Sequence, residues 1–140
     1  MLPTPPIPFE DIVGKPLSAT LAGLLSRAYG ESSKDEDADR LQLSFPSSGL
    51  YVLVDKATER VIDCALFSRP GARWTGEPYR WQLPAGLTFG MSREEVRAVA
   101  GTSVESNDRF RWDRWDLGKY LVRAGYTSTG HLVTVDVLAG

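Results

Sequence analysis

The chain has 140 residues, of which 42% are hydrophobic and 24% are charged, the length and composition of one ordinary globular domain. Such a composition excludes a disordered chain, and no apolar run reaches the roughly 20 residues that cross a bilayer. The net charge is −2, and the basic excess within residues 69–123 is too small to indicate a nucleic-acid-binding protein.

The first eleven residues contain four prolines and predict an extended arm, either disordered or lying along the domain. This segment has neither the basic nor the apolar region of a secretory signal. We therefore expect a cytoplasmic protein.

The next segment predicts a helix followed by an acidic loop and three strands. Apolar residues at helical spacing predict a helix over Pro16–Tyr29, and Gly30 suits its exit. Residues 31–40 are predicted as a loop, either a solvated connector or an acidic patch for a basic partner. Apolar runs then predict strands that end at Phe67, with the single cysteine, Cys64, as a buried hydrophobe.

Residues 68–86 form a long connection that contains Trp74, Tyr79 and Trp81. A connection of this length is unusual within a domain, and a plain linker would not need so many rings. Two interpretations remain: the rings pack back over the junction between the halves, or they form an aromatic contact surface.

The second half begins with the sharpest local motif of the chain. Ser92 and Glu95 have the spacing of a capping box, and they predict a helix over residues 93–100 that ends at Gly101. Three strands follow, with a hairpin near residues 118–119. The segment RWDRWD places two tryptophans three residues apart, so they should face opposite sides of a strand.

Within that segment, two aspartates flank an arginine. Asp113 and Asp116 are predicted either to form local ion pairs with Arg114 or to bind a partner. The sequence alone leaves both possibilities open.

Together these elements predict a single α+β domain made of two helix-plus-antiparallel-meander repeats. The repeats span about residues 12–67 and 87–138, with 68–86 as the linker and 1–11 as the arm. We expect the helices on one face of either one continuous sheet or two packed sheets.

The stretch LPAGLTFGMSREEVRAVAG, with the later WDRWDLGKYLVRAGY and LVTVDVL, resembles small immunity proteins of bacteriocin and polymorphic-toxin systems. It is also similar to the helix-plus-meander repeats of beta-lactamase-inhibitor-like and outer-membrane-assembly lipoprotein domains. The resemblance covers about residues 83–138. It implies an immunity protein that neutralises a cognate toxin by occluding its active site or an exosite.

No P-loop, G-x-S-x-G or H-E-x-x-H motif is present, so we expect no enzyme, and neither a cofactor nor a metal. The alternative function is a non-enzymatic interaction or assembly module, possibly homodimeric through its sheet edges. Neither reading involves nucleic acid or membrane as a partner. The candidate partner-binding residues are Asp35, Glu36, Asp37, Asp39, Trp74, Tyr79, Trp81, Trp112, Asp113, Trp115 and Asp116.

Overall fold

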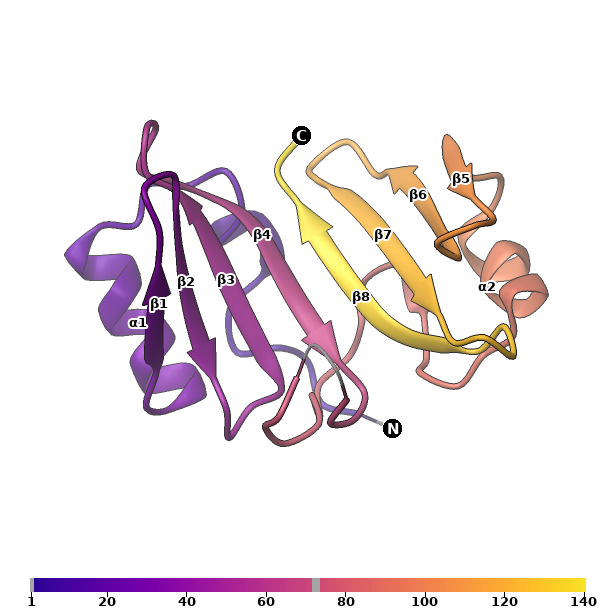
Figure 1. Ribbon diagram of the computed structural model, residues 1–140, viewed down its shortest axis with the longest axis horizontal. Helices are drawn as coiled ribbons and strands as arrows, with labels where there is room; N and C mark the ends of the chain where they lie inside the picture. The colour runs from indigo at the N-terminus through magenta and orange to yellow at the C-terminus, as the bar shows by residue number, and fades with distance from the viewer. Residues whose placement is uncertain (1, 72–73) are drawn as a thin grey trace.

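One eight-stranded antiparallel sheet runs through the computed structural model, which describes residues 2–71 and 74–140 (Figure 1). The strand order β1-β2-β3-β4-β8-β7-β6-β5 confirms the α+β class and places β4 beside β8 at the centre. The strands are β1 (Ser33–Glu36), β2 (Arg40–Phe45), β3 (Leu50–Asp55), β4 (Arg60–Phe67), β5 (Glu105–Asn107), β6 (Trp112–Asp116), β7 (Leu121–Tyr126) and β8 (Leu132–Leu138).

Each of the two α-helices in the described residues has a serine as its N-cap residue. Helix α1 (Ala19–Tyr29) starts three residues later than predicted, because the Ser18 hydroxyl accepts the Leu21 N–H at 3.1 Å. Helix α2 (Arg93–Ala100) has the predicted bounds and the predicted capping box. Neither described helix is long and apolar enough to cross a membrane.

The acidic stretch after α1 was predicted to be a loop, but part of it is a strand. Its residues Ser33–Glu36 form strand β1, which pairs with β2 at one edge of the sheet. All four residues of β1 are exposed, so this strand has no apolar alternation by which a sequence pattern could reveal it. The short edge strand β5 also escaped prediction, because none of its three residues is apolar.

One face of the sheet packs into the main hydrophobic core, to which both helices contribute. Leu25 of α1 and Val96 of α2 belong to this core, as do Val52, Val122 and Val135 of the sheet. The proline-rich arm lies along the domain, since its Ile7 and Phe9 are buried in the same core, as is Ile12 just after it.

The connection between the halves packs on both faces of the sheet. Its Tyr79 and Leu83 belong to the main core, and its Trp74 lies on the other face, which we call the second face. The rings of Phe67 and Trp74 stack there, with centroids 4.9 Å apart and planes 3° from parallel. The Phe67 carbonyl accepts the Tyr79 N–H at 2.8 Å. The Tyr79 backbone passes so close to Gly49 that a side chain at Gly49 would collide with it.

Candidate interaction site

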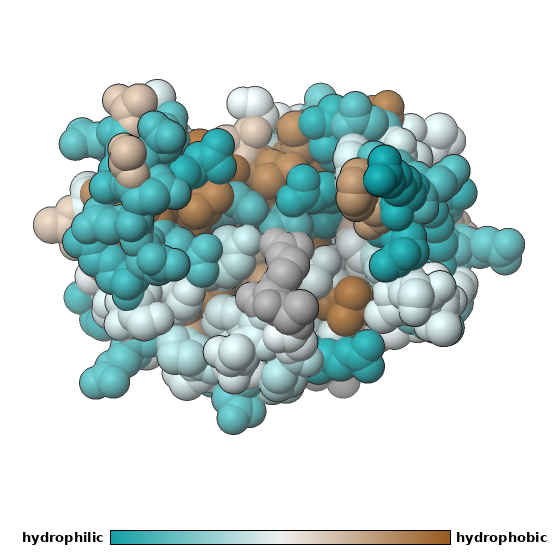
Figure 2. All heavy atoms as spheres, viewed as in Figure 1, coloured by the Kyte–Doolittle hydropathy of each residue, from teal (hydrophilic) through white to brown (hydrophobic). Residues whose placement is uncertain are grey.

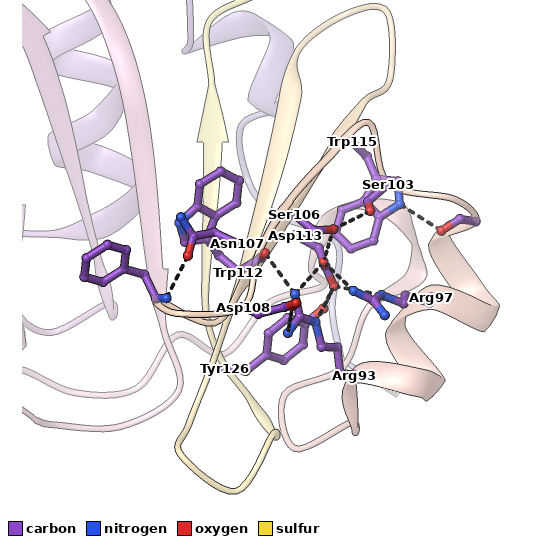
Figure 3. A network of polar contacts seen from close by, with 12 residues as sticks. Arg93, Arg97, Ser103, Ser106, Asn107, Asp108, Trp112, Asp113, Trp115 and Tyr126 are labelled. Carbon is purple, nitrogen blue, oxygen red and sulfur yellow. Dashed lines mark hydrogen bonds and ion pairs between the residues drawn. The ribbon is translucent and has the colours of Figure 1, made fainter.

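The best-organised polar cluster surrounds the carboxylate of Asp113 on β6, which is fully buried (Figure 3). Arg93 and Arg97 lie one turn apart on α2, so both guanidinium groups point to this carboxylate. Each donates through Nε and Nη2, at 3.1 and 2.9 Å from Arg93 and at 3.2 and 2.9 Å from Arg97. The hydroxyls of Ser106 and Tyr126 complete the set at 2.6 and 2.8 Å.

This geometry sets the charge of the cluster. Burial alone would raise the pKa of Asp113, but hydrogen bonds from Arg93, Arg97, Ser106 and Tyr126 outweigh burial and hold that pKa well below its usual range. Burial and the hydrogen bond to Asp113 raise the pKa of the Tyr126 hydroxyl. The cluster is therefore an ionised carboxylate between two cations.

The cluster links helix α2 to three strands of the sheet. It ties α2 to β6, and it reaches β5 through Ser106 and β7 through Tyr126. The indole N–H of Trp115 adds a bond to the carbonyl of Gly101, just after α2, at 3.0 Å. These bonds hold the C-terminal helix against the outer strands of its half.

Asp113 and Trp115 are therefore interior residues, and their contact with a partner stays a prediction. Residues two apart on a strand share a face, so the core position of Trp115 also places Asp113 inside. The alternating burial of β6 confirms that Trp112 and Trp115 face opposite sides. Arg114 pairs with Glu105 at 3.4 Å rather than with its flanking aspartates.

The predicted acidic residues lie on and just after the edge strand β1, at the opposite end of the sheet from β6. Glu36 forms an ion pair with Lys56 at 2.8 Å, and the hydrogen bond from Lys56 lowers the pKa of Glu36. Asp37 accepts the backbone N–H groups of Asp39 and Arg40, which lowers the pKa of Asp37. The other two acids of this group, Asp35 and Asp39, are also exposed.

The rings of the connection favour the packing interpretation. Trp74 and Tyr79 are buried, and the indole N–H of Trp74 donates to the Glu77 carbonyl at 2.8 Å. Trp81 is half-buried, with its ring centroid 5.3 Å from that of Tyr29 on α1. Tyr79 and Trp81 therefore pack on the N-terminal half, whereas Trp74 stacks on Phe67 of β4, the strand that pairs with β8 where the two halves join.

Two predicted residues remain at the surface near the C-terminal half. Asp116 is exposed, and its carboxylate accepts the Gly118 N–H at 2.8 Å within the β6–β7 turn. Trp112 is half-buried on the second face of the sheet.

Trp112 forms one wall of a hollow of about 350 Å³ that also contains Arg123, Thr134 and Asp136. The Arg123 guanidinium lies 6.0 Å from the centroid of the Trp112 ring and 3.2 Å from the Asp136 carboxylate. Gly125 pairs in register with both Trp112 and Thr134. A side chain at Gly125 would collide with Thr134, so the absence of a side chain at this position leaves the space of the hollow open.

Sequence reasoning missed the most exposed part of this region. The turn between β5 and β6 carries Phe110, which is 67% exposed although it is a large apolar residue. Arg109 and Arg111 flank it, and Arg111 has a φ of 56° that turns the chain back into β6. One signal in the sequence could have indicated it: Phe110 stands between two arginines and belongs to no periodic apolar pattern.

Two further hollows adjoin the first on the second face. One of about 380 Å³ is lined by Arg69, Trp74 and Arg111 among others, and one of about 400 Å³ contains Arg69 and His131. Figure 2 shows hydrophobic residues interspersed with hydrophilic ones over the strands. A separate hollow of about 630 Å³ beside Leu2 and Leu83 has no charged residue in its lining.

No family model matches this chain, and no curated protein sequence matches it. Among solved structures, it is similar to a cysteine-rich secretory protein from Staphylococcus aureus, with a TM-score of 0.62 and 13% identity over 99% of this chain and 48% of that one. It is also similar to an extracellular protein containing an SCP domain from Bacillus anthracis, with a TM-score of 0.57 and 14% identity over 96% of this chain and 46% of that one.

These likenesses show the fold alone, and this chain spans about half the length of either protein. They correct the predicted resemblance to toxin-immunity proteins, because the structural neighbours are secretory and SCP-domain proteins. The cytoplasmic location stays a prediction.

Proposed function

We propose that this protein is a non-enzymatic protein-binding module that contacts its partner through the second face of its C-terminal half. We call the contact surface the basic-aromatic face and define it by Phe110, Arg111, Trp112 and Arg123. The observation that carries the proposal is Phe110, a 67% exposed aromatic residue beside a hollow walled by Trp112 and Arg123.

The residue types support this proposal. Trp and Arg are enriched among the residues that dominate protein–protein binding, and a large ring can fill a pocket of the partner. Phe110 is a large apolar side chain at the tip of a turn, where packing within its own chain does not require it. The hydrogen bonds around Asp113 hold α2 against the strands behind this face, so the side chains of the face would be presented from a rigid support.

We infer further that the scaffold consists of two helix-plus-strand units, residues 12–67 and 87–138, with both helices on the face opposite the hollows. A protein partner is the class we propose, and neutralisation of a toxin stays an untested prediction within it. A homodimer through the sheet edges has less support, because the edge strand β1 is short, polar and charged.

The test replaces the two rings and compares capture of partners. Wild-type protein, the double variant Phe110→Ala/Trp112→Ala and the control Leu24→Ala are immobilised and exposed to a lysate of the source cells. Leu24 is also an exposed apolar residue, but it lies on α1 in the other half. We expect one protein that wild type and the control retain and that the double variant loses.

The purified partner then gives the magnitude. Loss of two central aromatic contacts should weaken binding by roughly 30-fold, measured by calorimetric titration, because such residues each contribute about 1 kcal/mol or more. Unchanged circular dichroism spectra would exclude misfolding. Equal capture by wild type and the double variant would contradict the proposal.

A further inference from the structure

We infer that the basic-aromatic face and its adjoining hollows receive an extended acidic segment of a partner protein. This inference rests on the proposed function and adds the chemistry of the ligand. The three hollows on the second face supply the shape, and their arginines supply the charge.

The three hollows lie next to one another, because neighbouring hollows share lining residues, and we call this row of hollows the furrow. The hollow at Trp112 and the hollow at Trp74 share Val133 and Thr134. The hollow at Trp74 shares Arg69 and Val133 with the hollow at His131. Each has a volume of about 350 to 400 Å³, so a row of three suits a chain segment of several residues better than one compact ligand.

The charge along this furrow is mainly positive. Arg69 and Arg111 are exposed, and within the described parts of the chain neither forms an ion pair. Arg123 lies farther along, half-exposed. The one carboxylate in the lining, Asp136, is 2% exposed and already pairs with Arg123. An incoming carboxylate would therefore meet exposed guanidinium groups, which hold such groups in a two-pronged geometry.

The rest of the molecule favours a short acidic segment over a nucleic acid. The chain has a net charge of −2, and acidic residues occupy the β1 end of the same sheet. A long polyanion that reached that end would meet acidic side chains. The rings of Phe110 and Trp112 can in addition receive apolar side chains of a peptide.

The experiment selects the ligand without assuming it. Random dodecapeptides displayed on phage are enriched on immobilised wild-type protein and depleted on Phe110→Ala/Trp112→Ala. The consensus peptide is synthesised with a fluorescent label, together with a neutral counterpart in which Gln and Asn replace Glu and Asp. We expect an acidic consensus with at least one apolar residue, and fluorescence anisotropy should show binding that weakens as salt is added.

Variants of the furrow then test the arginines. Arg69→Gln/Arg111→Gln should weaken binding of the acidic peptide by roughly five- to tenfold, since each exposed charge contact contributes up to about 1 kcal/mol. The charge-keeping pair Arg69→Lys/Arg111→Lys should lose less. The control Arg27→Gln/Arg40→Gln removes the same charge from exposed positions of the other half and should leave binding unchanged.

Three outcomes would overturn the inference. A neutral or basic consensus, or a neutral counterpart that binds equally well, removes the role of charge and leaves the proposed function standing. Equal competition by an oligonucleotide or by inorganic pyrophosphate means that the furrow binds anions in general. If no peptide is enriched, the acidic-segment inference fails, while the proposed function still depends on the partner-capture comparison.

Discussion

At the scale of single residues, Asp113 shows how a charged group becomes an interior one. Its two oxygens receive six hydrogen bonds from Arg93, Arg97, Ser106 and Tyr126. A buried carboxylate is tolerated only when such partners replace the lost water. Loss of the Asp113 charge would remove the shared acceptor of both arginines, although Arg93 also pairs with Asp108 at 3.1 Å and Arg97 is partly exposed to water.

Asp113→Asn should therefore destabilise the fold strongly. We expect a loss of roughly 2 kcal/mol in the free energy of unfolding at pH 7, since Asn replaces one acceptor oxygen by an NH2 donor and leaves buried donors such as the Tyr126 hydroxyl without their acceptor. Asp116→Asn on the same strand should change it by less than about 0.5 kcal/mol, because Asp116 is exposed and Asn keeps the oxygen that accepts the Gly118 N–H. Urea unfolding of both variants provides the measurement.

The same carboxylate makes stability depend on pH. Its pKa is lower in the folded than in the unfolded state, so its contribution is complete above an unfolded pKa of about 3.9. That contribution is lost as pH falls through the lower folded pKa. Wild type should lose stability between about pH 5 and pH 2 more steeply than Asp113→Asn. Parallel pH profiles for the two proteins would contradict the assignment.

At the scale of elements, α2 depends on its cap more than its length suggests. A helix of eight residues is marginal alone, and its Arg93 and Arg97 must stay in register with Asp113. The reciprocal bonds between Ser92 and Glu95 satisfy two backbone donors at its first turn. The helix cap and the hydrogen bonds to Asp113 therefore both keep α2 folded and in position.

Ser92→Ala should lower the free energy of unfolding by about 1 kcal/mol, the usual effect of losing a serine cap. Glu94→Gln serves as the control, because Glu94 occupies the same turn without a role in the cap. Thermal unfolding followed by circular dichroism gives both values. Equal effects of the two substitutions would mean that first-turn charge, and not the cap bond, stabilises α2.

These elements also show what sequence can predict. The cap motif predicted the bounds of α2, and alternating or continuous apolar residues predicted the longer strands, because both signals are local. Strand β1 gave no such signal, since every residue of it is exposed. The hollow at Trp112 brings together residues from the β5–β6 turn and from strands β6, β7 and β8, so it could not be found before the pairing was known. The burial of Asp113 was accessible from its spacing to Trp115.

At the scale of the whole molecule, pairing of β4 with β8 joins the two halves of the chain into one sheet. The main core continues across this join, from Leu66 on β4 to Val135 on β8. A continuous sheet over a continuous core should unfold as one cooperative unit.

Val135→Ala tests this cooperativity. Deleting two buried methyl groups at the join should reduce stability by roughly 2 kcal/mol, and amide hydrogen exchange should show the same decrease in β3 and in β7. Val133→Ala, on the half-exposed side of the same strand, should have a smaller effect. A decrease confined to one half would show that the halves unfold separately.

The strand order has a further consequence for how the protein behaves at high concentration. Growth of fibres requires a free strand edge that a second chain can extend, and here the two free edges are β1 and β5, which are short and polar. Apolar strands such as β3, β4 and β8 are enclosed by neighbours on both sides. Concentrated native protein should therefore resist amyloid-like polymerisation, and the hazard should arise only when β1 or β5 detaches and uncovers the strands behind it.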